Sequence, residues 1–197
     1  MATVVVPFRG TDPKQRLALA DEARRLLADA MLADVTGAAG ALGEVLVVAT
    51  AGTRLPEGTT LVDDPHRGQG AAVLAGLERA VARGLPAPYL VVNADLPCAT
   101  SRDLLALAGA VPDGGLALAP AADGTTNALA LSGDDLFRPV YGPGSAERFA
   151  ALAPSAVVDA PNLADDVDTL DDLARLEQRL GAHTRGAAAA LDLPSAA

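Results

Sequence analysis

Short apolar runs alternate along the chain with longer stretches that have the spacing of helices. The runs are rich in Val and Leu, and the longer stretches are rich in Ala and Leu, with apolar residues three or four positions apart. Strands are expected at residues 3–6, 45–49, 61–62, 89–92, 116–119, 127–131 and 157–158, and helices at 17–39, 68–83, 101–110, after Ser145, and at 169–180. This alternation predicts an α/β fold, with a parallel sheet covered by helices on both faces.

The first strand and the last helix fix the limits of the expected domain. Residues 3–6 read Thr-Val-Val-Val, which is typical of a strand buried on both faces. Near the other end, Thr169 followed three residues later by Asp172 indicates a capping box at the start of a helix. Beyond Leu180 the chain turns to Ala and Gly without a clear periodic face. We therefore expect one domain over residues 1–182 and a flexible tail over residues 183–197.

Composition and charge narrow the class of protein. Half of the 197 residues are hydrophobic, so the chain can bury a core, and 25 acids against 15 bases give a formal net charge of −10. Such a charge disfavours general nucleic-acid binding. The single cysteine, Cys98, fits a reducing compartment, and no apolar run approaches the roughly 20 residues that span a bilayer. We expect a soluble cytoplasmic protein without nucleic-acid or membrane partners.

The loop after the first strand concentrates positive charge. It carries Arg9, Lys14 and Arg16, and Lys14 is the one lysine beside fourteen arginines. These cations precede an expected helix N-terminus, where backbone N–H groups and the helix dipole favour an anion. The loop matches neither a Walker A motif nor the Rossmann glycine fingerprint. An anion site and a solvated basic loop are both compatible with this pattern.

Aspartates form the second group of candidates. Asp95 follows the apolar strand that ends at Val92, and residues 165–168 read Asp-Asp-Val-Asp. In extended backbone Asp166 and Asp168 point the same way, so the two can chelate one cation. The alternatives are a turn role for Asp95 and a helix N-terminal role for Asp168. Taken together, the aspartates predict a site for a hard divalent cation such as Mg²⁺.

Two loops of small residues could hold an anion. One is Asp-Gly-Thr-Thr-Asn at residues 123–127, and the other is Gly-Pro-Gly-Ser at residues 142–145, before a short helix. Both have the small, flexible and hydroxyl-bearing composition of phosphate-binding loops. Each is also compatible with a simple turn.

The order of these motifs resembles the CofC/FbiD family over roughly residues 3–176. The matching segments are Lys14 to Leu17, Ala30 to Leu32, Asp34-Val35, Ala94 to Pro97, Thr126 to Leu129, Gly142 to Ser145, and Asp166 to Thr169 with Asp172-Leu173. The family comprises guanylyltransferases of coenzyme F-420 biosynthesis. The resemblance implies a three-layer, Rossmann-like nucleotidyltransferase fold of GT-A type, with a mixed, mostly parallel sheet.

The resemblance also implies a reaction and a set of site residues. GMP would pass from GTP to a phosphorylated three-carbon acid, with release of diphosphate. The acid could be phosphoenolpyruvate, 2-phospho-L-lactate or 3-phosphoglycerate; because the Ala/Arg-rich composition suits an actinobacterial type of source, the resemblance favours phosphoenolpyruvate. The implied Mg²⁺ ligands are Asp95, Asp166 and Asp168; the implied acid-binding residues are Thr126, Gly142 and Ser145. The implied catalytic residues are Lys14, Arg16 and Asp95, and the nucleotide-binding residues are Pro7, Phe8, Arg9, Lys14, Gly68, Gln69, Gly70 and Asp95. A homodimer is compatible with the sequence.

The chain departs from the family pattern at three places. Gly68-Gln69-Gly70 stands where Gly-Leu-Asn is usual, which bears on the choice of base. Arg9 replaces a lysine, and Ala146 and Phe149 replace a Phe and a His. Two other functions stay open: another Mg²⁺-dependent nucleotidyltransferase, of the molybdopterin guanylyltransferase or sugar-phosphate or cytidylyl type, and a non-catalytic nucleotide-binding module.

Overall fold

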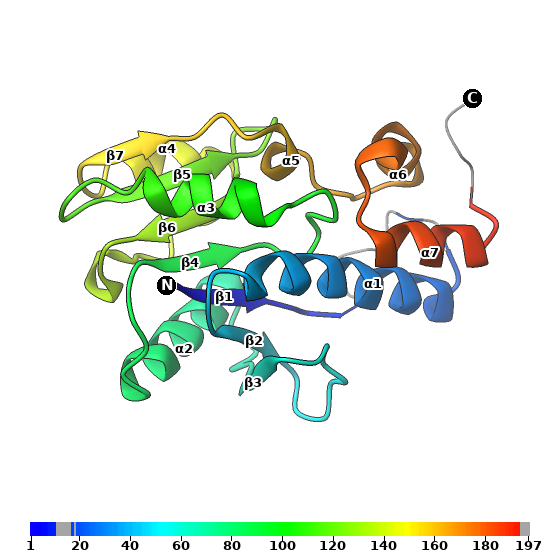
Figure 1. Cartoon of the computed structure of the whole chain (residues 1–197), viewed down its shortest axis with the longest axis horizontal. Helices are drawn as coiled ribbons and strands as arrows, with labels where there is room; N and C mark the ends of the chain where they lie inside the picture. Colours follow the sequence, from blue (N-terminus) through cyan, green and yellow to red (C-terminus); the bar gives the residue numbers. More distant parts are fainter. Residues whose placement is uncertain (11–16, 18, 194–197) are drawn as a thin grey trace.

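The computed structural model describes residues 1–10, 17 and 19–193. Within these residues, one seven-stranded sheet has the order β3-β2-β1-β4-β6-β5-β7 (Figure 1). The strands are β1 (Thr3–Pro7), β2 (Val45–Ala49), β3 (Thr59–Asp63), β4 (Tyr89–Val92), β5 (Leu116–Pro120), β6 (Thr126–Leu131) and β7 (Ser155–Val157). Strand β6 runs antiparallel to β4 and β5, and the other neighbouring strands pair in parallel. The expected mixed, mostly parallel sheet is confirmed.

Helices cover both faces of this sheet and divide the core in two (Figure 1). On one face lie α1 (Asp21–Gly40), α3 (Ser101–Gly109), α5 (Pro161–Ala164), α6 (Leu170–Leu176) and α7 (Ala182–Ala190). On the other face lie α2 (Gln69–Ala82) and α4 (Ser145–Ala150). Two short 3-10 helices, η2 (Asp134–Leu136) and η3 (Glu177–Arg179), complete the described elements. No helix among the described residues is long and apolar enough to cross a membrane.

Strand β1 shows why the sheet strands are apolar throughout. Val4 and Val6 contribute to the core under α1, and Val5 contributes to the core under α2. All three side chains are fully buried. Because successive residues of a strand face opposite sides, a strand between two helix layers must be apolar at every position. The expectation for this strand is confirmed.

Two helices are shorter than their apolar patterns predict. The helix expected at residues 17–39 begins at Asp21, after an extended Ala20, although Leu17 is fully buried ahead of it. The helix expected at residues 169–180 ends at Leu176 and tightens into η3. Its predicted capping box is confirmed, because Thr169 accepts from the backbone N–H of Asp172 while the Asp172 carboxylate accepts from that of Thr169. Apolar periodicity located these helices but not their ends.

The prediction of a flexible tail over residues 183–197 is wrong for residues 183–190, which belong to α7. This helix packs beside α1 (Figure 1). Its N-terminus is capped from α1: the Asp34 carboxylate accepts the backbone N–H of His183 at 3.0 Å and that of Thr184 at 2.8 Å. Thr184 and Ala187 are buried on the docked face. The capping residue lies about 150 positions earlier in the chain, so the residues next to the helix do not predict where it begins.

Asp34→Ala should therefore loosen α7 and lower the stability of the domain. Losing a helix cap costs about 1–2 kcal/mol, which corresponds to roughly 3–6 °C in Tm for a domain of this size. Glu78→Ala is the matched control, since it removes an exposed carboxylate from α2. Thermal unfolding of the two variants checks the prediction. Equal Tm values would show that the Asp34 cap contributes nothing.

Candidate active site

The candidate residues gather at one edge of the sheet. Strands β1 and β4 end there, and β6 begins there because it runs antiparallel to β4. A pocket of about 190 Å³ lies at this edge. Its lining residues come from the ends of β1 and β4, from α1 and from the start of α2: Pro7, Phe8, Arg9, Gly10, Ala28, Met31, Gln69, Asn93, Ala94 and Asp95. Ligands of open α/β sheets bind at this kind of edge.

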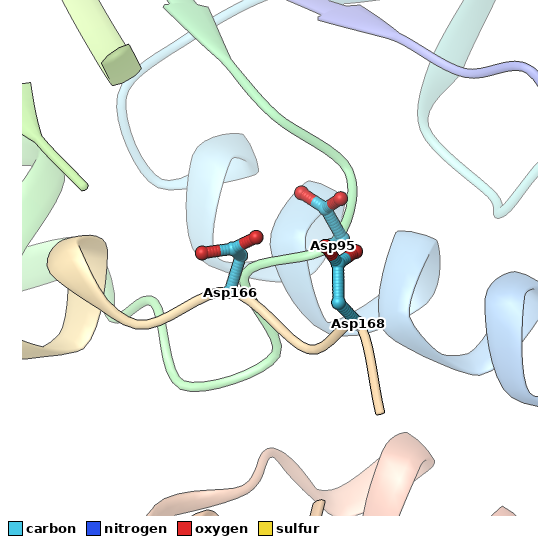
Figure 2. A group of neighbouring side chains, drawn as sticks. All are labelled: Asp95, Asp166 and Asp168. Carbon is cyan, nitrogen blue, oxygen red and sulfur yellow. The ribbon is translucent and has the colours of Figure 1, made fainter. Parts of the chain in front are cut away.

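Three carboxylates meet beside the pocket. One oxygen each of Asp95, Asp166 and Asp168 lies within 4.8 Å of the others. Figure 2 shows Asp95 on the loop after β4, and Asp166 and Asp168 on the segment that leads into α6. The backbone N–H of Val167 donates to the carbonyl oxygen of Asp95 at 3.0 Å, which ties the two segments together. Val167 itself is fully buried, so the two flanking aspartates face the same side, as their spacing predicts.

The charges of this cluster repel each other. Burial, and after it the charge of Asp95, raises the pKa of the Asp166 carboxyl, and Asp168 adds to the effect. A bound cation would relieve this repulsion. Three carboxylates with oxygen atoms this close fit a hard divalent ion such as Mg²⁺, which prefers oxygen ligands and keeps open positions for phosphate oxygens.

Asp166→Asn should accordingly stabilise the metal-free protein. The raised pKa means that folding favours the protonated acid, so wild-type stability falls as pH rises from about the ordinary value of 3.8 through the raised pKa. The Asp166→Asn variant cannot ionise at this position, so its stability does not fall in this way as pH rises. Because the carboxyl is only partly buried, we expect about 0.5 kcal/mol above the raised pKa, or ~1–2 °C in Tm.

The measurement is Tm against pH in EDTA, with Asp113→Asn as the control because Asp113 is an exposed loop acid. The difference between Asp166→Asn and wild type should shrink toward pH 4. A variant that is less stable than wild type at neutral pH would contradict the repulsion.

Asp165 has a different role from its neighbours. It forms ion pairs with Arg175, at 2.8 Å, and with Arg179. Burial alone would raise the pKa of Asp165, but the hydrogen bonds from the two guanidinium groups outweigh it and lower that pKa. Arg175 also pairs with Asp172, at 3.1 Å. These contacts anchor the segment that carries Asp166 and Asp168.

A pair of buried hydroxyl groups lies at the start of β6. Thr126 Oγ1 and Ser145 Oγ are 3.1 Å apart, and both residues are buried. Gly142 adopts a φ of +110°, and its carbonyl oxygen accepts the backbone N–H of Ser145 at 2.9 Å. The guanidinium of Arg148 donates to the carbonyls of Val140 and Pro143, which holds this loop. Thr126, Gly142 and Ser145 are thus brought together.

The expected nucleotide-binding residues divide into two sets. Pro7, Phe8, Arg9, Gln69 and Asp95 line the pocket. Gly68 and Gly70 are absent from its lining, and a Cβ at Gly70 would collide with Pro139, so packing explains this glycine. Lys14 and Arg16 lie outside the described residues.

Two asparagines join the pocket to the carboxylates. No role was predicted for Asn93, and Asn127 was predicted only as a member of the small-residue loop at 123–127. The Gln69 Nε2 donates to Asn93 Oδ1 at 2.8 Å, and Asn93 Nδ2 donates to Asn127 Oδ1 at 3.4 Å. Asn127 in turn donates to the Asp166 carboxylate. The available signal was an amide residue at the end of an apolar strand, where a buried polar group needs a partner.

Comparisons with known structures establish the fold. A putative nucleotide-diphospho-sugar transferase from Desulfovibrio desulfuricans G20 superposes with a TM-score of 0.74 at 16% identity, over 97% of this chain and 95% of the other. The 2-C-methyl-D-erythritol 4-phosphate cytidylyltransferase of Thermus thermophilus gives 0.58 at 21% identity, over 89% and 96%. The expected nucleotidyltransferase fold is confirmed.

Sequence comparisons establish the family. A 2-phospho-L-lactate guanylyltransferase from Halobacterium salinarum is 38% identical over 86% of this chain and 81% of its own length. A phosphoenolpyruvate guanylyltransferase from Conexibacter woesei is 34% identical over 91% and 90%. The family model described as "Guanylyl transferase CofC like" matches residues 2–178. By fold, motif order and sequence identity, this chain belongs to the CofC-like guanylyltransferase family.

Proposed function

We propose that the protein transfers GMP from GTP to a phosphorylated three-carbon acid and releases diphosphate, with Mg²⁺ as cofactor. One observation carries the proposal: the cluster of Asp95, Asp166 and Asp168 includes a residue of the pocket lining, Asp95, and Asp166 of the same cluster is contacted by Asn127, the chain neighbour of Thr126 in β6. Two anionic substrates could meet at the carboxylates, one bound in the pocket and the other beside the Thr126 and Ser145 hydroxyls.

The chemistry requires positioning rather than a general base. A phosphate oxygen of the acid attacks the α-phosphorus of GTP and forms a new P–O bond. The bond from the α-phosphorus to the bridging oxygen breaks, and its electron pair leaves with diphosphate. The attacking phosphate is already ionised at neutral pH, so no proton has to be removed. Mg²⁺ held by the three aspartates would neutralise charge on the reacting phosphates.

The chain supplies its own groups for each substrate. Ala28 and Met31 give the pocket an apolar wall, and Gln69 and Asn93 give it amides, a combination suited to a nucleobase and ribose. Arg9 also lines this pocket. We assign to Arg9, Lys14 and Arg16 the stabilisation of the triphosphate and the leaving diphosphate. Thr126, Gly142 and Ser145 would bind the phosphate of the acid.

The identity of the acid is a separate step of the proposal. Relatives of similar identity carry the names of two acids, 2-phospho-L-lactate and phosphoenolpyruvate. We favour phosphoenolpyruvate, in line with the expectation from composition. The relatives with that name, from Conexibacter woesei and Sphaerobacter thermophilus, cover 91% and 89% of this chain.

The test is a matrix of four nucleoside triphosphates against three acids, read by diphosphate release and by the mass of the product. GTP with phosphoenolpyruvate should give the highest rate and a product in which GMP is joined to the phosphate of the acid through a P–O–P bridge. A preference for CTP with a sugar phosphate would assign the protein to another nucleotidyltransferase reaction. Absence of diphosphate in every well would favour a non-catalytic nucleotide-binding module.

A further inference from the structure

Asn127 occupies an unusual place for a buried amide. It is the second residue of β6, it is 3% exposed, and it lies between the end of β4 and the segment that carries the aspartates. Its Nδ2 donates to the carbonyl oxygen of Ala164 at 3.3 Å, and its side chain donates to the Asp166 carboxylate. Its Oδ1 accepts from Asn93. A side-chain amide has two N–H donors and one carbonyl oxygen, and both ends of Asn127 are engaged.

Asn93 fixes the orientation of the Asn127 amide. The backbone N–H of Asn93 donates to the Asn127 carbonyl oxygen at 3.0 Å, so the two residues are paired through the main chain as well. The Asn93 Oδ1 accepts from Gln69 at 2.8 Å, which leaves its Nδ2 to point toward β6, where it donates to Asn127 Oδ1 and to the Thr126 carbonyl oxygen. With its Oδ1 held by an N–H donor, Asn127 must present its own N–H groups to Ala164 and Asp166.

We propose that Asn127, oriented by Asn93, is a positioning residue that sets the cation affinity of the carboxylate cluster by holding Asp166 toward Asp95 and Asp168. The inference rests on the cation assigned under the proposed function. Hydrogen-bond partners that orient a metal-binding side chain typically change metal affinity by about 10–100-fold when they are removed.

The contact with Asp166 matters because the other two ligands are held differently. The segment of Asp166 and Asp168 is joined to Asp95 through the backbone of Val167, and Asp168 donates its backbone N–H to Asp172 at 3.3 Å. One oxygen of Asp166 lies within 4.8 Å of an oxygen of Asp95 and of an oxygen of Asp168. A donor from Asn127 restricts the rotamer of the Asp166 carboxylate and so keeps its oxygen near those of Asp95 and Asp168.

The experiment measures Mn²⁺ binding to the nucleotide-free protein by EPR, so it does not depend on guanylyl transfer. Asn127→Leu removes the donor while retaining a buried side chain of similar size. Thr36→Val is the matched control, because Thr36 is equally buried and its hydroxyl bonds only within α1, to Leu32 and Ala33. Asp166→Asn, alone and combined with Asn127→Leu, tests whether the effect passes through Asp166.

Asn127→Leu should weaken Mn²⁺ binding about 10–100-fold, and Thr36→Val should stay within about twofold of wild type. In the Asp166→Asn background, Asn127→Leu should add at most about twofold. Wild-type affinity in Asn127→Leu, or an equal loss in the Asp166→Asn background, would overturn the inference. Circular dichroism checks folding; if the Leu variant does not fold, Asn127→Ser decides by the same criteria.

The same titration separates this inference from the function it rests on. If the wild-type protein takes up no Mn²⁺, the cation part of the proposed function fails, and the inference fails with it. If wild type binds Mn²⁺ and Asn127→Leu binds it equally well, the inference alone is overturned.

Discussion

Asp95→Asn is expected to lower kcat for diphosphate release by ~10³-fold or more, which corresponds to about 4 kcal/mol of transition-state stabilisation. Asp95 lines the pocket and also belongs to the carboxylate cluster, so it lies where the α-phosphate and the cation would meet. Asparagine keeps the size of the side chain but removes its charge. The fold should persist, since the variant removes one of three mutually repelling carboxylates.

The control for this prediction is Asp113→Asn, which removes one negative charge from an exposed loop position. It should keep kcat within about twofold of wild type. Steady-state kinetics at saturating GTP and acid, together with thermal unfolding, separates loss of chemistry from loss of fold. An Asp95→Asn variant that keeps more than about a tenth of wild-type kcat would contradict the assignment of Asp95.

The hydroxyl pair should control the binding of the acid substrate. Thr126→Val or Ser145→Ala is expected to raise KM for the acid by about 10-fold or more, since a hydrogen bond to a charged group contributes about 1.5–3 kcal/mol. The two hydroxyls are buried and face each other at 3.1 Å. Each substitution therefore also leaves the remaining hydroxyl short of a partner, which should reduce stability by about 1 kcal/mol.

Separate KM values for the acid and for GTP provide the measurement. The KM for GTP should change by less than about threefold, because neither Thr126 nor Ser145 belongs to the pocket lining. Ser155→Ala, on the exposed edge strand β7, is the control. A rise confined to the KM for GTP would contradict the assignment of Thr126 and Ser145 to the binding site of the acid.

Local pattern predicted the features that depend on neighbouring residues. The fully apolar β1 reflects its position between two helix layers, and the alternation of Asp166, Val167 and Asp168 places one residue in the core and two in the site. The capping box of Thr169 and Asp172 is equally local. In each case, the pattern of residues that reports the feature spans only a few neighbouring positions, so it can be read from the sequence directly.

Features that depend on distant partners were missed or given another meaning. Helix α7 is capped by Asp34 from the first third of the chain, and a Cβ at Gly70 would collide with Pro139, a packing constraint from a distant residue. Asp165 was grouped with the other aspartates, yet Arg175 and Arg179 bind it instead. Such roles are set by tertiary contacts, which spacing along the chain does not encode.

The most direct test of the proposed reaction is a crystal structure with Mg²⁺, phosphoenolpyruvate and a GTP analogue whose α,β-bridging oxygen is replaced by a methylene group. We predict the α-phosphate and the cation at Asp95, Asp166 and Asp168, and the phosphate of the acid beside Thr126 and Ser145. A nucleotide bound with its α-phosphate away from these aspartates, or a sugar phosphate in place of the acid, would contradict the proposed guanylyl transfer.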